Sequence, residues 1–201
     1  MNAVIFKQDN PGAERSRVLL IDGSEQDDSA QREHTVRMVH LSKQLLEESG
    51  MEVELLDPAL HRSSDVYEKW LFTDGVMIIA PTGSEAIGRQ FRPAIDRLAA
   101  AGYTAKLADR AYGVVVHGQR DQMPGMREDL TGWLDGMGMV DADSFAALDH
   151  HLGYHEGVPG AAQEQHDYEA EVRSVARAVS NAVTELRAGR LTPPERRARA
   201  A

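Results

Sequence analysis

The sequence predicts an α/β protein of three layers, in which helices cover both faces of a parallel five-stranded sheet. Three observations predict this fold class. Short apolar runs recur along the chain, as in strands that are buried on both faces. Segments with a helical spacing of apolar residues lie between these runs. Gly, Pro or polar stretches punctuate most of the changes from one kind of segment to the other. Strands that alternate with helices in this way favour a parallel sheet with right-handed crossovers.

The apolar runs identify the strands in chain order. RVLLID ends at Gly23, as a buried parallel strand does before a loop, and MEVELLD alternates with one more polar side, which favours a place near a sheet edge. GVMIIAPT is the most apolar run and is expected at the centre of the sheet. YGVVVHG is another buried strand, and MVDADSF holds a weak fifth one. The expected strands are therefore residues 17–22, 51–57, 75–82, 112–118 and 139–145.

Apolar stripes identify the helices between these strands. The first is expected from His34 to Ser49, because Val36, Val39 and Leu46 share one stripe and Gly50 suits the residue after a helix end. Further helices are expected over residues 64–73, 87–102 and 123–138. The last helix follows a loop of about 20 residues. It carries an apolar stripe with spacings of 3, 4, 4 and 3: Val172, Val175, Val179, Val183 and Leu186.

Length and composition limit the remaining possibilities. The 201 residues favour one domain with a real core, and we expect an arm over 1–16, the domain over 17–190 and a flexible basic tail over 191–201. Cysteine is absent, which excludes disulfides, thiolate metal sites and cysteine nucleophiles. The formal net charge of −10 argues against a nucleic-acid or anionic-membrane partner.

Targeting signals are not evident in the sequence. No apolar run approaches the ~20 residues of a membrane span. The N-terminus lacks a charged segment followed by a long apolar core, so it does not resemble a signal peptide. We therefore expect a cytoplasmic protein that does not contact membranes.

Three loops are expected to meet at one edge of the sheet, because the strands that precede them are parallel. They are residues 23–35, 81–87 and 117–125. Ligands of such sheets bind at the carboxyl ends of the strands, where the strand order switches. This edge is the predicted binding site.

Three segments of the chain together resemble the flavodoxin-like NAD(P)H-dependent FMN reductases. The segments are VLLIDGS with its polar loop, TDGVMIIAPTGSEAIGRQFRPAIDRL, and YGVVVHGQRDQMPGMREDLTGWLDGMGM. Their order and spacing carry the resemblance, which covers about residues 17–145. The resemblance implies a flavodoxin-like strand order of 2-1-3-4-5, a non-covalent FMN and hydride transfer from NADH or NADPH. It also implies a homodimer or homotetramer.

The resemblance also assigns roles to residues of the three loops. Hydroxyl and amide groups of the first loop would hold the FMN phosphate, and these are Ser24, Ser29, Gln31, His34 and Thr35. The second loop would lie along the isoalloxazine ring, and its residues are Pro81, Thr82, Gly83, Ser84 and Glu85. The third loop would close on the other edge of the ring, through His117, Gly118, Gln119 and Arg120.

Elementary chemistry agrees with this assignment in part. Backbone N–H groups at the start of the first helix form a natural anion site. The first loop, however, carries Glu25, Asp27 and Asp28, and unit charges 4 Å apart interact by roughly 4 kcal/mol even at an effective dielectric constant of ~20. The second loop, PTGSEA, contains no aromatic residue to stack on a flavin.

Each candidate residue also has a purely structural interpretation. Ser24 and Thr35 suit ordinary turn and helix-cap positions. His117 is either a contact to the flavin or substrate or a hydrogen-bonded structural histidine, and Arg120 is either an anion contact or an exposed loop residue. The His-rich segment around His150 has no helical metal-ligand spacing, so no metal site is predicted.

Two hypotheses follow for the function. In the first, the chain is an FMN-dependent oxidoreductase that passes electrons from NADH or NADPH to a quinone, a flavin or another small acceptor. In the second, it is a flavodoxin-like protein that has lost tight FMN binding and acts as a non-catalytic accessory subunit. The hydroxyl groups of the loops favour the first hypothesis, and the acidic first loop favours the second.

Overall fold

The chain forms one parallel sheet from five strands. The computed structural model describes residues 15–24, 29–58, 60, 63–83, 87, 92–98, 100, 108–119, 121–143 and 168–190. The strands are β1 (Arg17–Asp22), β2 (Glu52–Leu56), β3 (Gly75–Pro81), β4 (Ala111–His117) and β5 (Val140–Asp141). Their order in the sheet is β2-β1-β3-β4-β5. The predicted fold class and strand order are therefore confirmed.

The position of each strand follows from its sequence. The strand β3 lies at the centre, and all of its residues are buried, as expected for the most apolar run. The strand β2 lies at an edge, and most of its residues are partly or fully exposed. The fifth strand is even shorter than predicted, since β5 pairs only Val140 and Asp141 with the start of β4.

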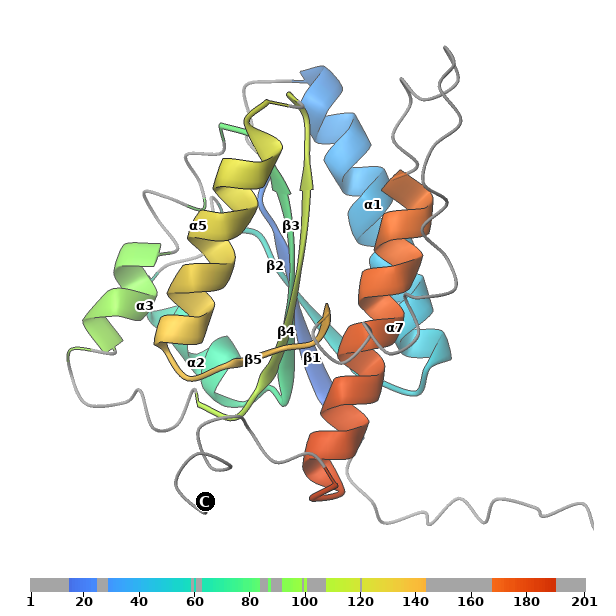
Figure 1. Cartoon of the computed structure of the whole chain (residues 1–201), viewed down its shortest axis with the longest axis vertical. Helices are drawn as coiled ribbons and strands as arrows, with labels where there is room; N and C mark the ends of the chain where they lie inside the picture. Colours follow the sequence, from blue (N-terminus) through green and yellow to red (C-terminus); the bar gives the residue numbers. More distant parts are fainter. Residues whose placement is uncertain are drawn as a thin grey trace, which may run out of the picture.

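Helices cover both faces of this sheet (Figure 1). One face carries α1 (Ser29–Glu48) and α7 (Tyr168–Arg187), and the other carries α2 (Ser63–Leu71), α3 (Arg92–Leu98) and α5 (Met123–Gly136). The prediction that the first helix begins at His34 was wrong. The helix begins five residues earlier, at Ser29. Its first turn is almost wholly polar, so no apolar stripe marks it in the sequence.

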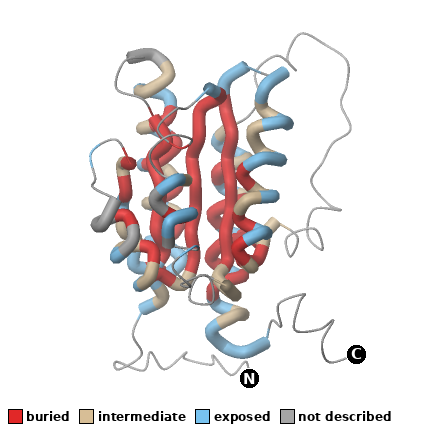
Figure 2. The backbone as a smooth tube through the Cα atoms, turned by 90° about the vertical axis from the view of Figure 1, so that its left-hand side faces the viewer, coloured by how far each residue is buried: buried red, intermediate tan, exposed pale blue. Residues whose placement is uncertain are grey.

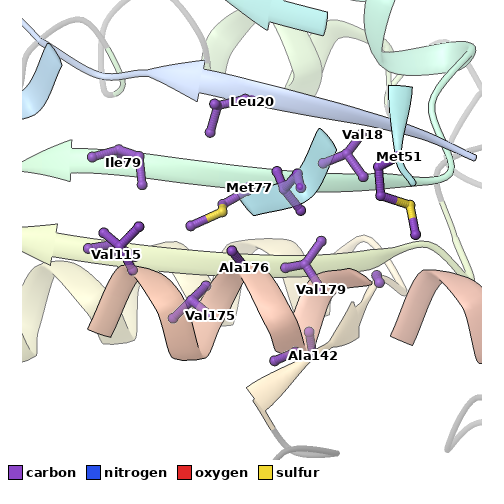
Figure 3. Close-up of a cluster of buried hydrophobic side chains, with 14 of the residues drawn as sticks. Val18, Leu20, Met51, Met77, Ile79, Val115, Ala142, Val175, Ala176 and Val179 are labelled. Carbon is purple, nitrogen blue, oxygen red and sulfur yellow. The ribbon is translucent and has the colours of Figure 1, made fainter. Parts of the chain in front are cut away.

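Two apolar layers hold the helices to the sheet. Alternate residues of a strand point to opposite faces, so Val18 and Leu20 pack toward α1 and α7, whereas Leu19 and Ile21 pack toward α2, α3 and α5. The strands β3 and β4 are buried along their whole length (Figure 2). Figure 3 shows the layer between the sheet and α7, where Val175 and Val179 lie against the strands.

A glycine allows α7 to approach the sheet closely. A Cβ atom at Gly113 in β4 would lie 2.6 Å from methyl groups of both Val175 and Val179. The absent side chain therefore sets the distance between α7 and the strand.

Some expectations lie outside the described residues. Residues 1–14 and 191–201 are among these, so the arm and the tail stay predictions. Within the described part of the chain, no helix is both long and apolar enough to cross a lipid bilayer.

Candidate functional site

The carboxyl ends of β1, β3 and β4 lie side by side, at the upper end of the sheet in Figure 1. Asp22 pairs with Ile79, and Pro81 pairs with His117, so the three strands end within a few residues of one another. The strand register thus brings three of the chain's loops to one edge, as the sequence predicted.

Thr82, directly after β3, connects the residues after β4 with the first turn of α1 at this edge. Its backbone N–H donates to the carbonyl of His117 (2.7 Å), and its hydroxyl accepts from the N–H of Gln119 (2.9 Å). The side-chain amide of Gln31 donates to the carbonyl of Thr82 (3.4 Å). Gly118 makes this approach feasible, because it has φ of +120° and a Cβ there would lie 2.3 Å from the Thr82 hydroxyl oxygen.

A buried hydrogen-bond pair lies beneath the loops. The Thr35 hydroxyl donates to the carbonyl of Gln31 (2.8 Å), and its oxygen lies 3.0 Å from Nε2 of His117. Because a hydroxyl has one proton to donate, we infer that His117 carries its proton on Nε2 and donates it to Thr35. Burial, followed by the proximity of His34, lowers the pKa of His117 to about 4, which keeps the ring neutral at pH 7.

The ring of His117 also packs against two other rings, those of His34 and Tyr168. The ring centroids of His34 and His117 are 5.2 Å apart, and those of His34 and Tyr168 are 5.0 Å apart, both in edge-to-face geometry. The N–H of Gly118 also reaches the hydroxyl of Tyr168, at 3.5 Å. Sequence reasoning missed Tyr168, although its place at the start of the last helix points to the same edge of the sheet.

Asp22 is the second residue that sequence reasoning missed. It was counted only as the last residue of a strand, yet its carboxylate is buried at the edge and accepts the N–H of Ser24 at 2.9 Å. The N–H of Gly23 donates to the carbonyl of Ile79, also at 2.9 Å. Both of these backbone donors are thus directed into the protein. An acidic residue directly before the Gly-Ser pair was the signal that could have identified Asp22.

The structure brings most of the predicted site residues together. Those that meet at the edge are Ser24, Gln31, His34, Thr35, Pro81, Thr82, Gly83, His117, Gly118 and Gln119. Gly83 and Gln119 are exposed there, whereas Thr35 has no exposed surface. Ser84, Glu85, Arg120, the Ser29 side chain and the His-rich segment around His150 lie outside the described residues.

Two cavities lie away from this edge. One of about 390 Å³ lies beside β5 and α5, and it is lined by Val114, Pro124, Arg127, Glu128, Thr131, Asp141 and Asp143. Another of about 290 Å³ lies at the opposite end of the sheet, near Asp74 and Arg187. Neither cavity includes a residue that the sequence assigned to the site.

Solved structures with the same fold are numerous, whereas no family model and no curated protein sequence matches the chain. RosB, solved with 8-demethyl-8-formylriboflavin-5′-phosphate, has a TM-score of 0.62 at 15% identity, over 93% of this chain and 86% of RosB. An oxidoreductase of Corynebacterium diphtheriae has a TM-score of 0.57 at 12% identity, over 86% and 99%.

A third similar structure is a flavodoxin, WrbA-like protein of Agrobacterium tumefaciens. Its TM-score is 0.54 at 17% identity, over 85% of this chain and 98% of that one. Identities this low carry information on the fold alone. The resemblance that the sequence suggested is confirmed at this level, and the chain has the flavodoxin-like fold.

Proposed function

We propose that this chain is a flavin-dependent oxidoreductase that passes electrons from NADH or NADPH to a quinone, a free flavin or another small acceptor. The observation that carries the proposal is the meeting of the segments after β3 and β4 with the first turn of α1, around Thr82 at the carboxyl edge of the sheet. In open parallel sheets, this edge is where ligands bind.

The structural relatives support a flavin as the cofactor. RosB was solved with a riboflavin-5′-phosphate derivative, and another similar structure is an oxidoreductase. A bound flavin would supply the redox chemistry, so the chain itself would not need to provide a nucleophile. The chain's own residues would bind the flavin, orient it and limit the access of water.

The residues after β3 and β4 suit the ring of a flavin. Gly83 is exposed and has no side chain, so a flat ring can approach the backbone there. Gln119 is exposed on the neighbouring loop and offers an amide side chain. His117 lies beneath the loops as a neutral ring, where it positions the first helix through Thr35.

The phosphate half of FMN fits less well. The Thr35 hydroxyl and the Gln31 amide, two predicted phosphate donors, make hydrogen bonds within the protein. This observation favours the alternative function, a flavodoxin-like protein without tight FMN that acts as an accessory subunit. We retain a homodimer or homotetramer as an expectation for either function, to be measured by light scattering.

The visible spectrum of the purified protein separates the two functions. The protein is mixed with excess FMN or riboflavin and desalted, and the reductase predicts about one flavin retained per chain. Anaerobic NADH or NADPH should then bleach the flavin absorbance. The Thr82→Ala variant, which removes the acceptor for Gln119, serves as the site control and Thr184→Ala as the remote control. A protein that retains neither flavin, and whose added flavin is not reduced, would support the accessory subunit.

A further inference from the structure

Asp22 brings a negative charge to the place where the phosphate of FMN is expected. It ends β1, directly before the first loop, and its residue surface is only 8% exposed. Its carboxylate oxygen accepts the N–H of Ser24 at 2.9 Å. A carboxylate on a loop N–H makes the same kind of hydrogen bond that a ligand phosphate would make.

Other donors of this region are also engaged within the protein. The N–H of Gly23 donates to Ile79, the Thr35 hydroxyl donates to the carbonyl of Gln31, and the amide of Gln31 donates to Thr82. Since a donor proton serves mainly one strong acceptor, the Gly23 N–H and the Thr35 hydroxyl offer little to a second anion. The Gln31 amide has two protons and lies 3.4 Å from its acceptor, so it is only partly engaged.

The balance of charge around the loop points the same way. The sequence adds three carboxylates between Ser24 and Ser29, namely Glu25, Asp27 and Asp28, and the nearest cation along the chain is Arg32. The buried Asp22 supplies a further anion at the start of the loop. Like charges in a partly desolvated site repel more strongly than in water.

We propose that the carboxylate of Asp22 takes the place of the ligand's phosphate at the first loop, so that the site binds flavins through their ring and accepts riboflavin as well as FMN. This inference rests on the proposed function, in that a flavin must bind at the edge. Asp22 would then determine specificity, because it removes the preference for FMN over riboflavin. The ligands of the site would be flavins with or without a 5′-phosphate.

The test is a titration of FMN and of riboflavin against the wild-type chain, Asp22→Asn and Asp129→Asn, followed by flavin fluorescence. Asparagine keeps an oxygen that can accept the Ser24 N–H but removes the charge. Asp129 lies exposed on α5, so its variant is a control for net charge alone. We expect the two flavins to bind the wild type with Kd values within about tenfold, and Asp22→Asn to tighten FMN by about tenfold without changing riboflavin.

Salt provides a second readout, because screening weakens repulsion. In the wild type, the affinity for FMN should rise between low and high NaCl, and the rise should be smaller in Asp22→Asn. Riboflavin affinity should change little in either protein. If Asp22→Asn does not fold, Asp22→Ser offers another uncharged acceptor for the same comparison with the wild type.

The outcomes separate this inference from the proposed function. FMN binding more than about tenfold tighter than riboflavin in the wild type, or equal FMN affinities in the wild type and Asp22→Asn, would overturn the role of Asp22 and leave flavin binding intact. Failure of both flavins to bind the wild type would overturn the proposed function and this inference together.

Discussion

The hydrogen bond between Thr35 and His117 joins residues that are 82 positions apart in the chain. It links α1 to the end of β4, and both residues are buried. A buried donor that loses its acceptor costs more than the net value of one hydrogen bond, because the donor cannot regain water. At the scale of single residues, this pair therefore contributes to the stability of the edge as well as to its shape.

Replacing Thr35 with valine tests this contribution. The change keeps the side-chain shape but leaves the Nε2 proton of His117 without its acceptor, so we expect the free energy of unfolding to fall by about 1–3 kcal/mol. Urea denaturation measures it. The control is Thr184→Val on the exposed side of α7, which removes a hydroxyl with the same helical bond and should cost less than about 0.5 kcal/mol. Equal losses in the two variants would rule out a special role for the pair.

His117 also predicts a dependence of stability on pH. Its folded pKa of about 4 lies below its ordinary value of 6.5, so between these values the unfolded chain binds the proton more readily. Stability should therefore fall as the pH falls from about 6.5 to about 4, by at most about 3 kcal/mol from this group.

The variant His117→Gln isolates this effect, because glutamine can donate to Thr35 but does not titrate. Burial raises the pKa of Asp141 to about 6, which makes stability fall with rising pH over part of the same range. The difference between the variant and the wild type cancels that contribution. We therefore measure the free energy of unfolding of both proteins by chemical denaturation from pH 4 to 7. The value for the wild type minus that for His117→Gln should rise with pH between about 4 and 6.5. His40→Gln on the exposed side of α1 serves as the control. If the free energy of unfolding depends on pH in the same way in His117→Gln and in the wild type, the neutral, buried ring is contradicted.

At the scale of elements, α7 packs closely against β4. It depends on Gly113, since any side chain there would meet Val175 and Val179 at 2.6 Å. Both valines are part of the buried layer on this face of the sheet. The helix can move away only by loosening that layer.

We expect Gly113→Ala to destabilise the protein by about 1–3 kcal/mol through overpacking. The matched control is Gly132→Ala in α5, where a Cβ would have nothing within 4 Å. Alanine favours a helix over glycine, so this control should stabilise by up to about 1 kcal/mol. Opposite signs in thermal denaturation are the expected result. A neutral Gly113→Ala would show that α7 can shift without cost.

At the scale of the whole molecule, a formal net charge of −10 and a site that is already anionic act together. Both disfavour a ligand whose affinity depends on a phosphate. A ligand held through its ring would still stabilise the folded chain, because binding to the native state alone raises its stability.

Flavin binding should therefore raise the melting temperature. At about 100 times its Kd, a flavin should add about 2.7 kcal/mol, which is about 5–10 °C for a chain of this length. We expect similar rises from FMN and riboflavin at equal concentration, measured by circular dichroism so that flavin fluorescence does not interfere. A rise from FMN alone would indicate a working phosphate site.

The sequence by itself determined the elements and the edge. A strand that is buried on both faces has a continuous apolar run, and a helix that is buried on one face has an apolar stripe. The strands and most of the helices could therefore be located from local patterns. Parallel strands with loops at their carboxyl ends then identified the binding edge. The polar first turn of α1 had no such pattern, and the start of that helix was misplaced.

Only the tertiary structure decided which polar groups at the edge are available to a ligand. The sequence offered Gln31 and Thr35 as phosphate donors and counted Asp22 as the end of a strand. The fold directs the first two to partners inside the protein and turns Asp22 onto the loop. The physical reason is that a hydrogen-bond donor is used by whichever acceptor the fold brings within about 3 Å, and that neighbour is often distant in sequence.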